Sequence, residues 1–108
     1  MNLNFNFLRK KTLRKIFLNH KGKICDKWDS YINNYEKELS FYREKPIILL
    51  EIGVQNCGSL EIWAKYFTKA KKIIGVDILK EIEDFNFNDA RIKTLKWIGS
   101  SRQFLGLF

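Results

Sequence analysis

Residues 47–60, IILLEIGVQNCGSL, constrain the fold of this chain more than any other stretch. The first six are apolar apart from Glu51, and Pro46, the only proline, precedes them, which favours the start of a strand over its middle. An apolar run without alternation is typical of a strand covered on both faces, and therefore of a parallel sheet. Gly53 and Gly58 indicate that this strand runs into a glycine-bearing turn, and a helix is expected to follow.

The residues after the turn predict that helix. Its apolar positions fall on a single helical face: Leu60, Trp63, Ala64 and Phe67. Ser59 is expected to cap its start, and Glu61 lies in the first turn, where a negative charge is favourable. Three cations suit its far end: Lys69, Lys71 and Lys72.

A second apolar run predicts a second strand, made of Ile73, Ile74, Val76 and Ile78. Asp77 lies at its carboxyl end, nineteen positions after Gly58. The order strand, glycine turn, helix, strand and acid is the arrangement in which a carboxylate binds the ribose hydroxyls of a nucleotide. We therefore expect a nucleotide-type ligand in one hollow that both Glu51 and Asp77 face.

The turn distinguishes between two kinds of nucleotide ligand. A dinucleotide site has Gly-x-Gly-x-x-Gly, whereas Gln55 occupies the middle glycine position here, which hinders close approach to a pyrophosphate. Glu51, two residues before the first glycine, repels a pyrophosphate and attracts a cation. S-adenosylmethionine carries an ammonium, a sulfonium and no phosphate, so electrostatics favour it over NAD. A nicotinamide enzyme is the weaker alternative.

Several segments together resemble class I S-adenosylmethionine-dependent methyltransferases, and among them the macrocin O-methyltransferase-like branch, over residues 20–105. They are Asp26-Lys27-Trp28, Tyr31, Tyr35-Glu36, residues 50–63 and Gly75-Val76-Asp77-Ile78. The resemblance implies an α/β fold, a Rossmann-like half-sheet of three mainly parallel strands in the order 3-2-1 with N-terminal helices. It also implies S-adenosyl-L-methionine as cofactor and a hydroxyl of a sugar or related small molecule as methyl acceptor.

By the same resemblance, Glu51 and Gly53 line the methionine end of the cofactor and Asp77 its ribose. The other expected cofactor-binding residues are Gln55, Gly58 and Ser59 in the turn and Ser100 near the adenine, a place that Ser101 also suits. Cys57 stands where the family usually has glycine, and a positive φ there would strain it. The family's base and its magnesium ligands follow a fourth strand that this chain lacks, so the catalytic residues are unknown and no metal ligand is assigned.

The remainder of the chain extends this pattern. Residues 80–89 read as a short helix or irregular loop, and residues 91–98 alternate like a third strand near a sheet edge. With three strands, residues 24–108 are expected to be the N-terminal portion of a methyltransferase domain, truncated or completed by another chain, with an open strand edge available for self-association. The alternative is a non-catalytic remnant or interaction module.

The charge is concentrated near the start of the chain. Of 20 basic residues, seven lie in residues 1–23 with no acid, and the other thirteen share residues 24–108 with all 12 acids. Residues 1–23 therefore form a basic arm whose apolar residues allow an amphipathic helix: Leu8, Leu13, Ile16, Phe17 and Leu18. Its charges are expected to be solvated, with peripheral membrane contact as an alternative. Nucleic acid is less favoured because aromatic residues are not interleaved with the basic ones.

A helical stripe follows the arm and is expected to pack on the sheet: Trp28, Tyr31, Ile32, Tyr35, Leu39 and Tyr42. Cys25 and Cys57 are the only cysteines, which indicates a reducing, cytoplasmic setting without a disulfide framework. His20, Cys25 and Asp26 lack the spacing of a metal site. No run of about eighteen apolar residues predicts a membrane span.

Overall fold

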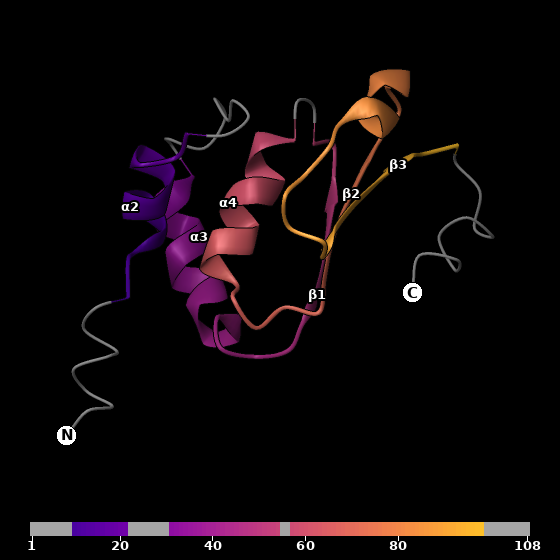
Figure 1. Ribbon diagram of the computed structural model, residues 1–108. Helices are drawn as coiled ribbons and strands as arrows, with labels where there is room; N and C mark the ends of the chain where they lie inside the picture. The colour runs from indigo at the N-terminus through magenta and orange to yellow at the C-terminus, as the bar shows by residue number, and fades with distance from the viewer. Residues whose placement is uncertain (1–9, 22–30, 55–56, 99–108) are drawn as a thin grey trace.

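The computed structural model describes residues 10–21, 31–54 and 57–98, which fold into helices packed on one side of a sheet (Figure 1). In chain order the elements are α2 (Leu13–Leu18), α3 (Ile32–Leu39), the 3₁₀ turn η1 (Ser40–Tyr42), β1 (Ile48–Ile52), α4 (Gly58–Tyr66), β2 (Lys72–Asp77), the 3₁₀ turn η2 (Lys80–Asp84) and β3 (Ile92–Lys96). The predicted strands and the helix between the first two are confirmed. None of the described helices is long and apolar enough to cross a membrane.

The three strands form one parallel sheet in the order β1-β2-β3. The register pairs Ile52 with Val76 and Asp77 with Lys96, so all three strands end at the same side of the sheet. The N–H of Gly53 continues the pairing beyond β1 by donating to the carbonyl of Val76 over 2.8 Å. The predicted fold class, a Rossmann-like half-sheet in the order 3-2-1, is therefore confirmed.

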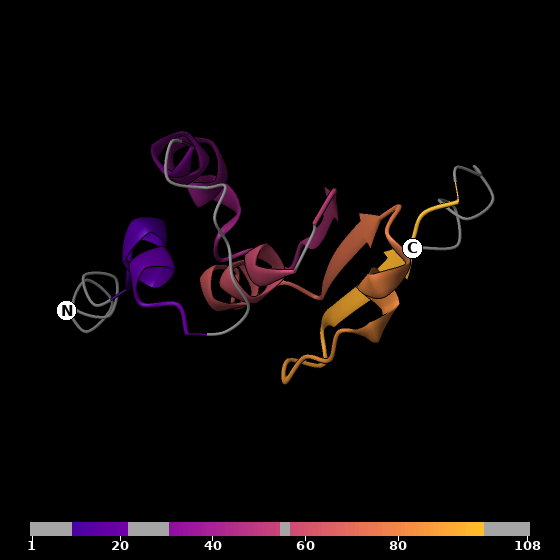
Figure 2. The same cartoon turned by 90° about the horizontal axis from the view of Figure 1, so that it is seen from above.

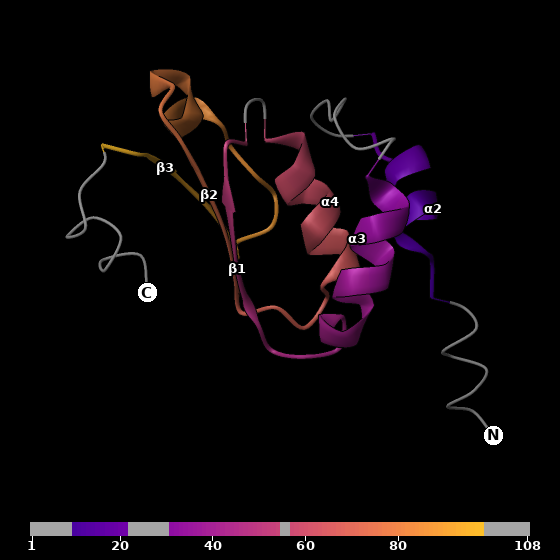
Figure 3. The same cartoon turned by 180° about the vertical axis from the view of Figure 1, so that it is seen from behind.

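Helix α4 lies close against the face of the sheet to which Gly75 belongs (Figures 1 and 3). A methyl group added to Gly75 would lie 2.6 Å from Leu60 Cδ1 and 3.0 Å from Val54 Cγ1. These distances are shorter than carbon contacts allow, so only glycine at this position permits the close packing of helix on sheet. The buried residues predicted for this helix are confirmed: Leu60, Trp63, Ala64 and Phe67.

The opposite face of the sheet carries a smaller apolar cluster. Ile74 and Val76 are its buried members, and three partly buried side chains pack on them: Leu50, Leu95 and Trp97. All the described helices lie on the other side, as Figure 2 shows from above. The expected cover on both faces of the first strand is therefore not found among the described residues, and Ile52 is 76% exposed.

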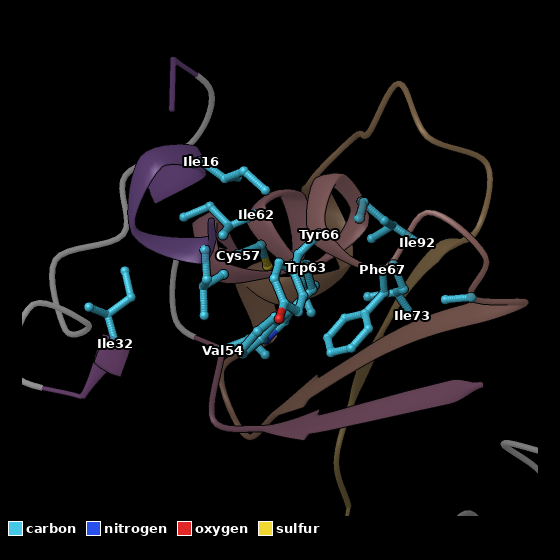
Figure 4. Packing of buried hydrophobic residues seen from close by; sticks show 14 of the residues in the cluster. Ile16, Ile32, Val54, Cys57, Ile62, Trp63, Tyr66, Phe67, Ile73 and Ile92 are labelled. Atoms are coloured by element: carbon cyan, nitrogen blue, oxygen red, sulfur yellow. The ribbon is translucent and has the colours of Figure 1, made fainter. Parts of the chain in front are cut away.

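Helix α2 joins the main core although it comes from the predicted basic arm. Leu13 and Ile16 are buried, and Figure 4 shows Ile16 in the same cluster as Ile62 and Trp63 of α4. Phe17 packs partly against this cluster. The amphipathic helix is thus present, but its apolar side packs onto the domain, and this is where the structure departs from a solvated arm. The proposed boundary at residue 23 lies outside the described residues.

The stripe that was expected to pack on the sheet packs mainly on helices instead. Ile32 is buried, and the ring of Tyr35 meets that of Trp63 of α4 edge-on, with centroids 5.6 Å apart. Tyr31 precedes α3 and is 55% exposed. Tyr42 is 44% exposed because it follows in η1, where a tighter turn moves it off the helical face. Trp28 lies outside the described residues.

Both predicted ends of α4 need correction. Cys57, not Ser59, is the N-cap residue, and no side chain caps the helix there. At the other end the helix stops at Tyr66, with Lys65 as the basic residue of its last turn. The three predicted lysines follow the helix, and the last of them begins β2: Lys69, Lys71 and Lys72.

Arg91 caps the carboxyl end of α4, a contact that the sequence analysis did not predict. Its guanidinium donates to the carbonyls of Ala64 in the last turn (2.9 Å), of the C-cap residue Phe67 (2.8 Å) and of Ala70 beyond the helix (3.2 Å). The carbonyls of a last helical turn lack intrahelical partners, and a basic side chain there satisfies them. Asp89 holds this guanidinium, with Arg91 Nη2 2.6 Å from Asp89 Oδ2. The pair raises the pKa of Arg91 and lowers that of Asp89.

Glu36 joins α2, α3 and α4. Its Oε1 accepts a hydrogen bond from the N–H of Leu13 over 3.1 Å, and its Oε2 accepts one from the hydroxyl of Tyr66. Burial and the neighbouring Glu36 raise the pKa of the Tyr66 phenol well above its usual value. This carboxylate therefore fixes the start of α2 against the end of α4.

Candidate functional site

A hollow of about 460 Å³ lies along the outer edge of β1, between this strand and α3. We call it the edge hollow. It is lined by Tyr31, Tyr35, Leu39, Leu49, Leu50, Glu51, Ile52, Gly53 and Trp63. Its volume falls within the range of small-molecule sites, and it reaches the carboxyl end of β1, where ligands bind in open α/β sheets.

Among the described residues, Glu51 is the only charged one that lines the edge hollow. Its Oε2 accepts a hydrogen bond from the hydroxyl of Ser59 over 2.9 Å, and its Oε1 accepts one from the indole N–H of Trp63 over 2.7 Å. Each oxygen of a carboxylate has two acceptor positions, so a carboxylate can accept more bonds than these two. The two donors hold the carboxylate in one orientation before any ligand arrives.

The partners of Glu51 are positioned by α4. Ser59 and Trp63 are four residues apart, so they lie on one helical face and reach the same strand residue. Ser59 is 5% exposed, and its hydroxyl is used to orient Glu51 rather than to cap the helix. The four-residue spacing was visible in the sequence, but it did not reveal that the shared partner is Glu51.

Three aromatic rings adjoin this carboxylate. The centroids of Tyr31 and Tyr35 are 6.2 Å apart, and those of Tyr35 and Trp63 are 5.6 Å apart. Aromatic faces attract cations, and a carboxylate adds a full negative charge. The edge hollow therefore suits a positively charged organic group.

The backbone around the turn adopts the left-handed region twice. Gly53, which lines the edge hollow, has a φ of +82°, and no heavy atom lies within 4 Å of a Cβ built on it. Cys57 has a φ of 68° although it carries a side chain, and it is fully buried. The expected strain at Cys57 is therefore present, because the left-handed region costs a non-glycine residue about 1–2 kcal/mol.

Asp77 is the last residue of β2 and is 9% exposed. The register pairs Glu51 with Gly75, two residues before Asp77, so side-chain alternation puts both carboxylates on the same face of the sheet. However, Asp77 does not line the edge hollow, and its Oδ1 accepts a hydrogen bond from the N–H of Leu79 over 3.1 Å. The predicted common hollow for both carboxylates is thus not found among the described residues.

The remaining predicted site residues have different outcomes. Gly58 is the buried first residue of α4 and does not line the edge hollow. Gln55 and Ser100 lie outside the described residues. Within the described residues, no group of three or more histidine, cysteine, aspartate and glutamate side chains is placed to hold a metal ion.

The three parallel strands, with α4 between β1 and β2, define a Rossmann-like α/β half-sheet. The solved structure of the MycE methyltransferase from the mycinamycin biosynthetic pathway, in complex with Mg and SAH, is similar to this chain with a TM-score of 0.65 and 24% sequence identity. The similarity covers 90% of this chain and 28% of the MycE chain. This likeness shows the fold. No protein-family model matches the sequence, and no curated protein matches it.

Proposed function

We propose that this chain forms the cofactor-binding part of an S-adenosylmethionine-dependent methyltransferase. The sulfonium and ammonium of the cofactor bind in the edge hollow beside Glu51, and the methyl group goes to a hydroxyl of a sugar or related small molecule. The fold shared with MycE, whose structure contains SAH, supports the proposal.

One observation carries the proposal: a carboxylate held by Ser59 and Trp63 lies in a hollow with aromatic walls. Such a site stabilises a cation both through its charge and through the faces of its rings. The one charge among the described residues of the edge hollow is the negative charge of Glu51. Its repulsion of a pyrophosphate argues against the nicotinamide alternative.

The chemistry assigned to this chain is binding and alignment. Methyl transfer is a displacement at the methyl carbon of the sulfonium, and a protein accelerates it by orienting the reactants and excluding water. Glu51 is proposed to fix the positively charged end of the cofactor, with Gly53, Gln55, Gly58 and Ser59 around it. Asp77 is proposed to bind the ribose, and Ser100 to lie near the adenine. No catalytic base and no magnesium ligand is assigned.

Calorimetric titration with S-adenosylmethionine and SAH tests the proposal. We expect Glu51→Gln to weaken S-adenosylmethionine binding by about tenfold or more, because one charge-assisted contact is lost. Glu38→Gln, which removes the same charge from an exposed position of α3, is the matched control and should bind normally. SAH, which lacks the sulfonium charge, should bind more weakly and should be less affected by Glu51→Gln.

The competing functions predict other results. A non-catalytic interaction module predicts no heat with S-adenosylmethionine at about 1 mM and no effect of Asp77→Ala. A nicotinamide enzyme predicts NAD binding that improves in Glu51→Gln. Three further expectations stay predictions: self-association through the open edge of β1, membrane contact by residues 1–23 and a cytoplasmic location. For membrane contact, Leu13 and Ile16 are buried in the domain, so these two apolar side chains do not face a membrane.

A further inference from the structure

A second cavity, of about 350 Å³, lies against α2 and α4. We call it the basic cavity. It is lined by Lys11, Ile16, Asn19, Arg43 and Lys65, none of which lines the edge hollow. Three of these five side chains are cations and none is an acid, so the charge of the basic cavity is opposite to that of the edge hollow.

The three cations come from separate parts of the chain. Lys11 precedes α2, Arg43 follows η1 and Lys65 lies in the last turn of α4. Bringing three like charges to one cavity is unfavourable, because they repel one another. An anion bound in the cavity would attract all three cations, and this attraction would offset their mutual repulsion.

Two of the cations are held in place by neighbouring side chains. The guanidinium of Arg43 lies 4.3 Å from the centre of the Tyr66 ring, and the Tyr66 hydroxyl donates to Glu36. This cation–π contact holds the guanidinium beside the Tyr66 ring. A guanidinium carries five N–H donors in a rigid fork, so Arg43 can offer paired hydrogen bonds to an anion in the basic cavity.

Lys65 is held in a similar way. Its Nζ lies 3.2 Å from Nδ1 of His20. An ammonium only donates, so Nδ1 accepts and the ring proton lies on Nε2, which is 3.8 Å from Oε1 of Glu61. One donor of Lys65 is thus used for orientation, and an ammonium has three donors in total.

The acids near the basic cavity have other partners. Glu44 pairs with Lys10, which lowers the pKa of Glu44, and Glu36 accepts from Tyr66 and from the N–H of Leu13. Neither acid lines the basic cavity. Within the part of the chain that the structure describes, the lining of the basic cavity is thus positive and includes no carboxylate.

We propose that the basic cavity binds the phosphate group of a phosphorylated small molecule such as a sugar phosphate. An arginine fork with lysine ammonium groups is the usual protein site for a phosphate. The buried Ile16 and the amide of Asn19 suit the organic part of the molecule, and the volume lies at the lower end of the small-molecule range. None of the described residues that line the cavity is aromatic, so they offer no stacking surface for nucleic-acid bases.

The test is a calorimetric titration of the full chain with glucose 6-phosphate and, separately, with inorganic phosphate. We expect the ester to bind more tightly than the free ion. Combined Lys11→Gln and Lys65→Gln changes should weaken ester binding by about tenfold or more. The matched control combines Lys37→Gln and Lys72→Gln, which remove two exposed lysines that do not line the basic cavity, and it should keep its affinity within about twofold.

A second variant separates geometry from charge. Arg43→Lys keeps the charge but removes the planar fork, and we expect it to weaken ester binding by about tenfold while circular dichroism shows a folded chain. The proposal is overturned if no phosphate ester binds at about 10 mM. The proposal is also overturned if the control variant loses as much affinity for the ester as the Lys11→Gln and Lys65→Gln variant. A chain that binds only an oligonucleotide or phosphatidylserine vesicles overturns it as well. Because the two cavities share no residue, failure here leaves the S-adenosylmethionine titration unaffected.

Discussion

The indole N–H of Trp63 donates to Glu51 Oε1 over 2.7 Å, and this hydrogen bond links the helix that covers the sheet to the carboxylate of the edge hollow. The same indole ring meets Tyr35 of α3 edge-on. Trp63 therefore joins three elements at one point: β1, α3 and α4. A change at this residue affects both the packing of the domain and the orientation of its candidate ligand group.

Trp63→Phe should weaken S-adenosylmethionine binding more than it weakens the fold. Phenylalanine keeps most of the ring packing but removes the donor to Glu51, which is worth about 1–2 kcal/mol for a bond to a charged group. We expect a several-fold weaker affinity by calorimetry and a small fall in the urea midpoint. Trp97→Phe, on the opposite face of the sheet, is the control and should leave the affinity unchanged. Equal loss of affinity in both variants would contradict the assigned role.

Gly75→Ala should destabilise the domain by about 1–3 kcal/mol, because the added methyl group overlaps Leu60 and Val54. Urea unfolding measures this change.

Gly53→Ala tests a different cause. Nothing lies within 4 Å of its added Cβ, so only the φ of +82° is unfavourable, and we expect a destabilisation of about 1–2 kcal/mol.

A double variant tests whether contact with Leu60 causes the destabilisation by Gly75→Ala. In the background of Leu60→Ala, which removes the nearest methyl carbon at 2.6 Å and another at 3.2 Å, Gly75→Ala should cost less than it does alone. Strictly additive costs would show that the effect of Gly75→Ala does not arise from contact with Leu60.

Cys57→Gly should be more stable than Cys57→Ala by about 1 kcal/mol, because both variants lose the thiol and only alanine keeps the unfavourable left-handed conformation. The comparison between the two variants isolates the backbone, whereas either variant alone also changes the packing of a fully buried side chain. Chemical denaturation of both variants measures the difference, and a more stable alanine variant would contradict a strained backbone at this position.

The strands could be predicted from the sequence because their determinants are local. The apolar runs at residues 47–52 and 73–76 mark two strands directly, although only the second is buried, and Gly58 and Asp77 lie at the expected spacing around the helix. The partners of Glu51 could not be predicted, because Ser59 and Trp63 meet it only after the chain has turned back on the strand. Likewise, the basic arm was judged from its charges, whereas Leu13 and Ile16 are buried through packing against distant elements.

The contact of Arg91 with α4 could not be predicted from the sequence either. Its three carbonyl partners lie 21 to 27 residues away along the chain, and no local pattern marks an arginine that caps a helix it does not belong to. Arg91→Lys should destabilise the domain by about 1–3 kcal/mol, because an ammonium does not reach three carbonyls in the plane of a fork. Urea unfolding measures the cost, and the exposed Lys93→Arg change of β3 is the control.

The pair of Arg91 and Asp89 also predicts how stability depends on pH. The pKa of Asp89 is lowered in the folded chain, mainly by its hydrogen bond to Arg91. A lowered folded-state pKa means that the unfolded chain binds the proton more readily, so the contribution of Asp89 is complete above its ordinary pKa and is lost as the pH falls through the folded value. The difference in unfolding free energy between the wild-type chain and Asp89→Asn should be constant from about pH 7 to pH 5 and should shrink below about pH 4.

Urea unfolding at a series of pH values measures this difference. The side chains of the pair are 25% and 32% exposed, so added salt should reduce the difference as well. Asp84→Asn is the matched control, because Asp84 is an exposed aspartate of η2 outside the pair of Arg91 and Asp89, and its difference from the wild-type chain should stay small and nearly flat with pH. A difference for Asp89→Asn that grows as the pH falls would reverse the predicted sign, and would mean that the charged pair does not stabilise the end of α4.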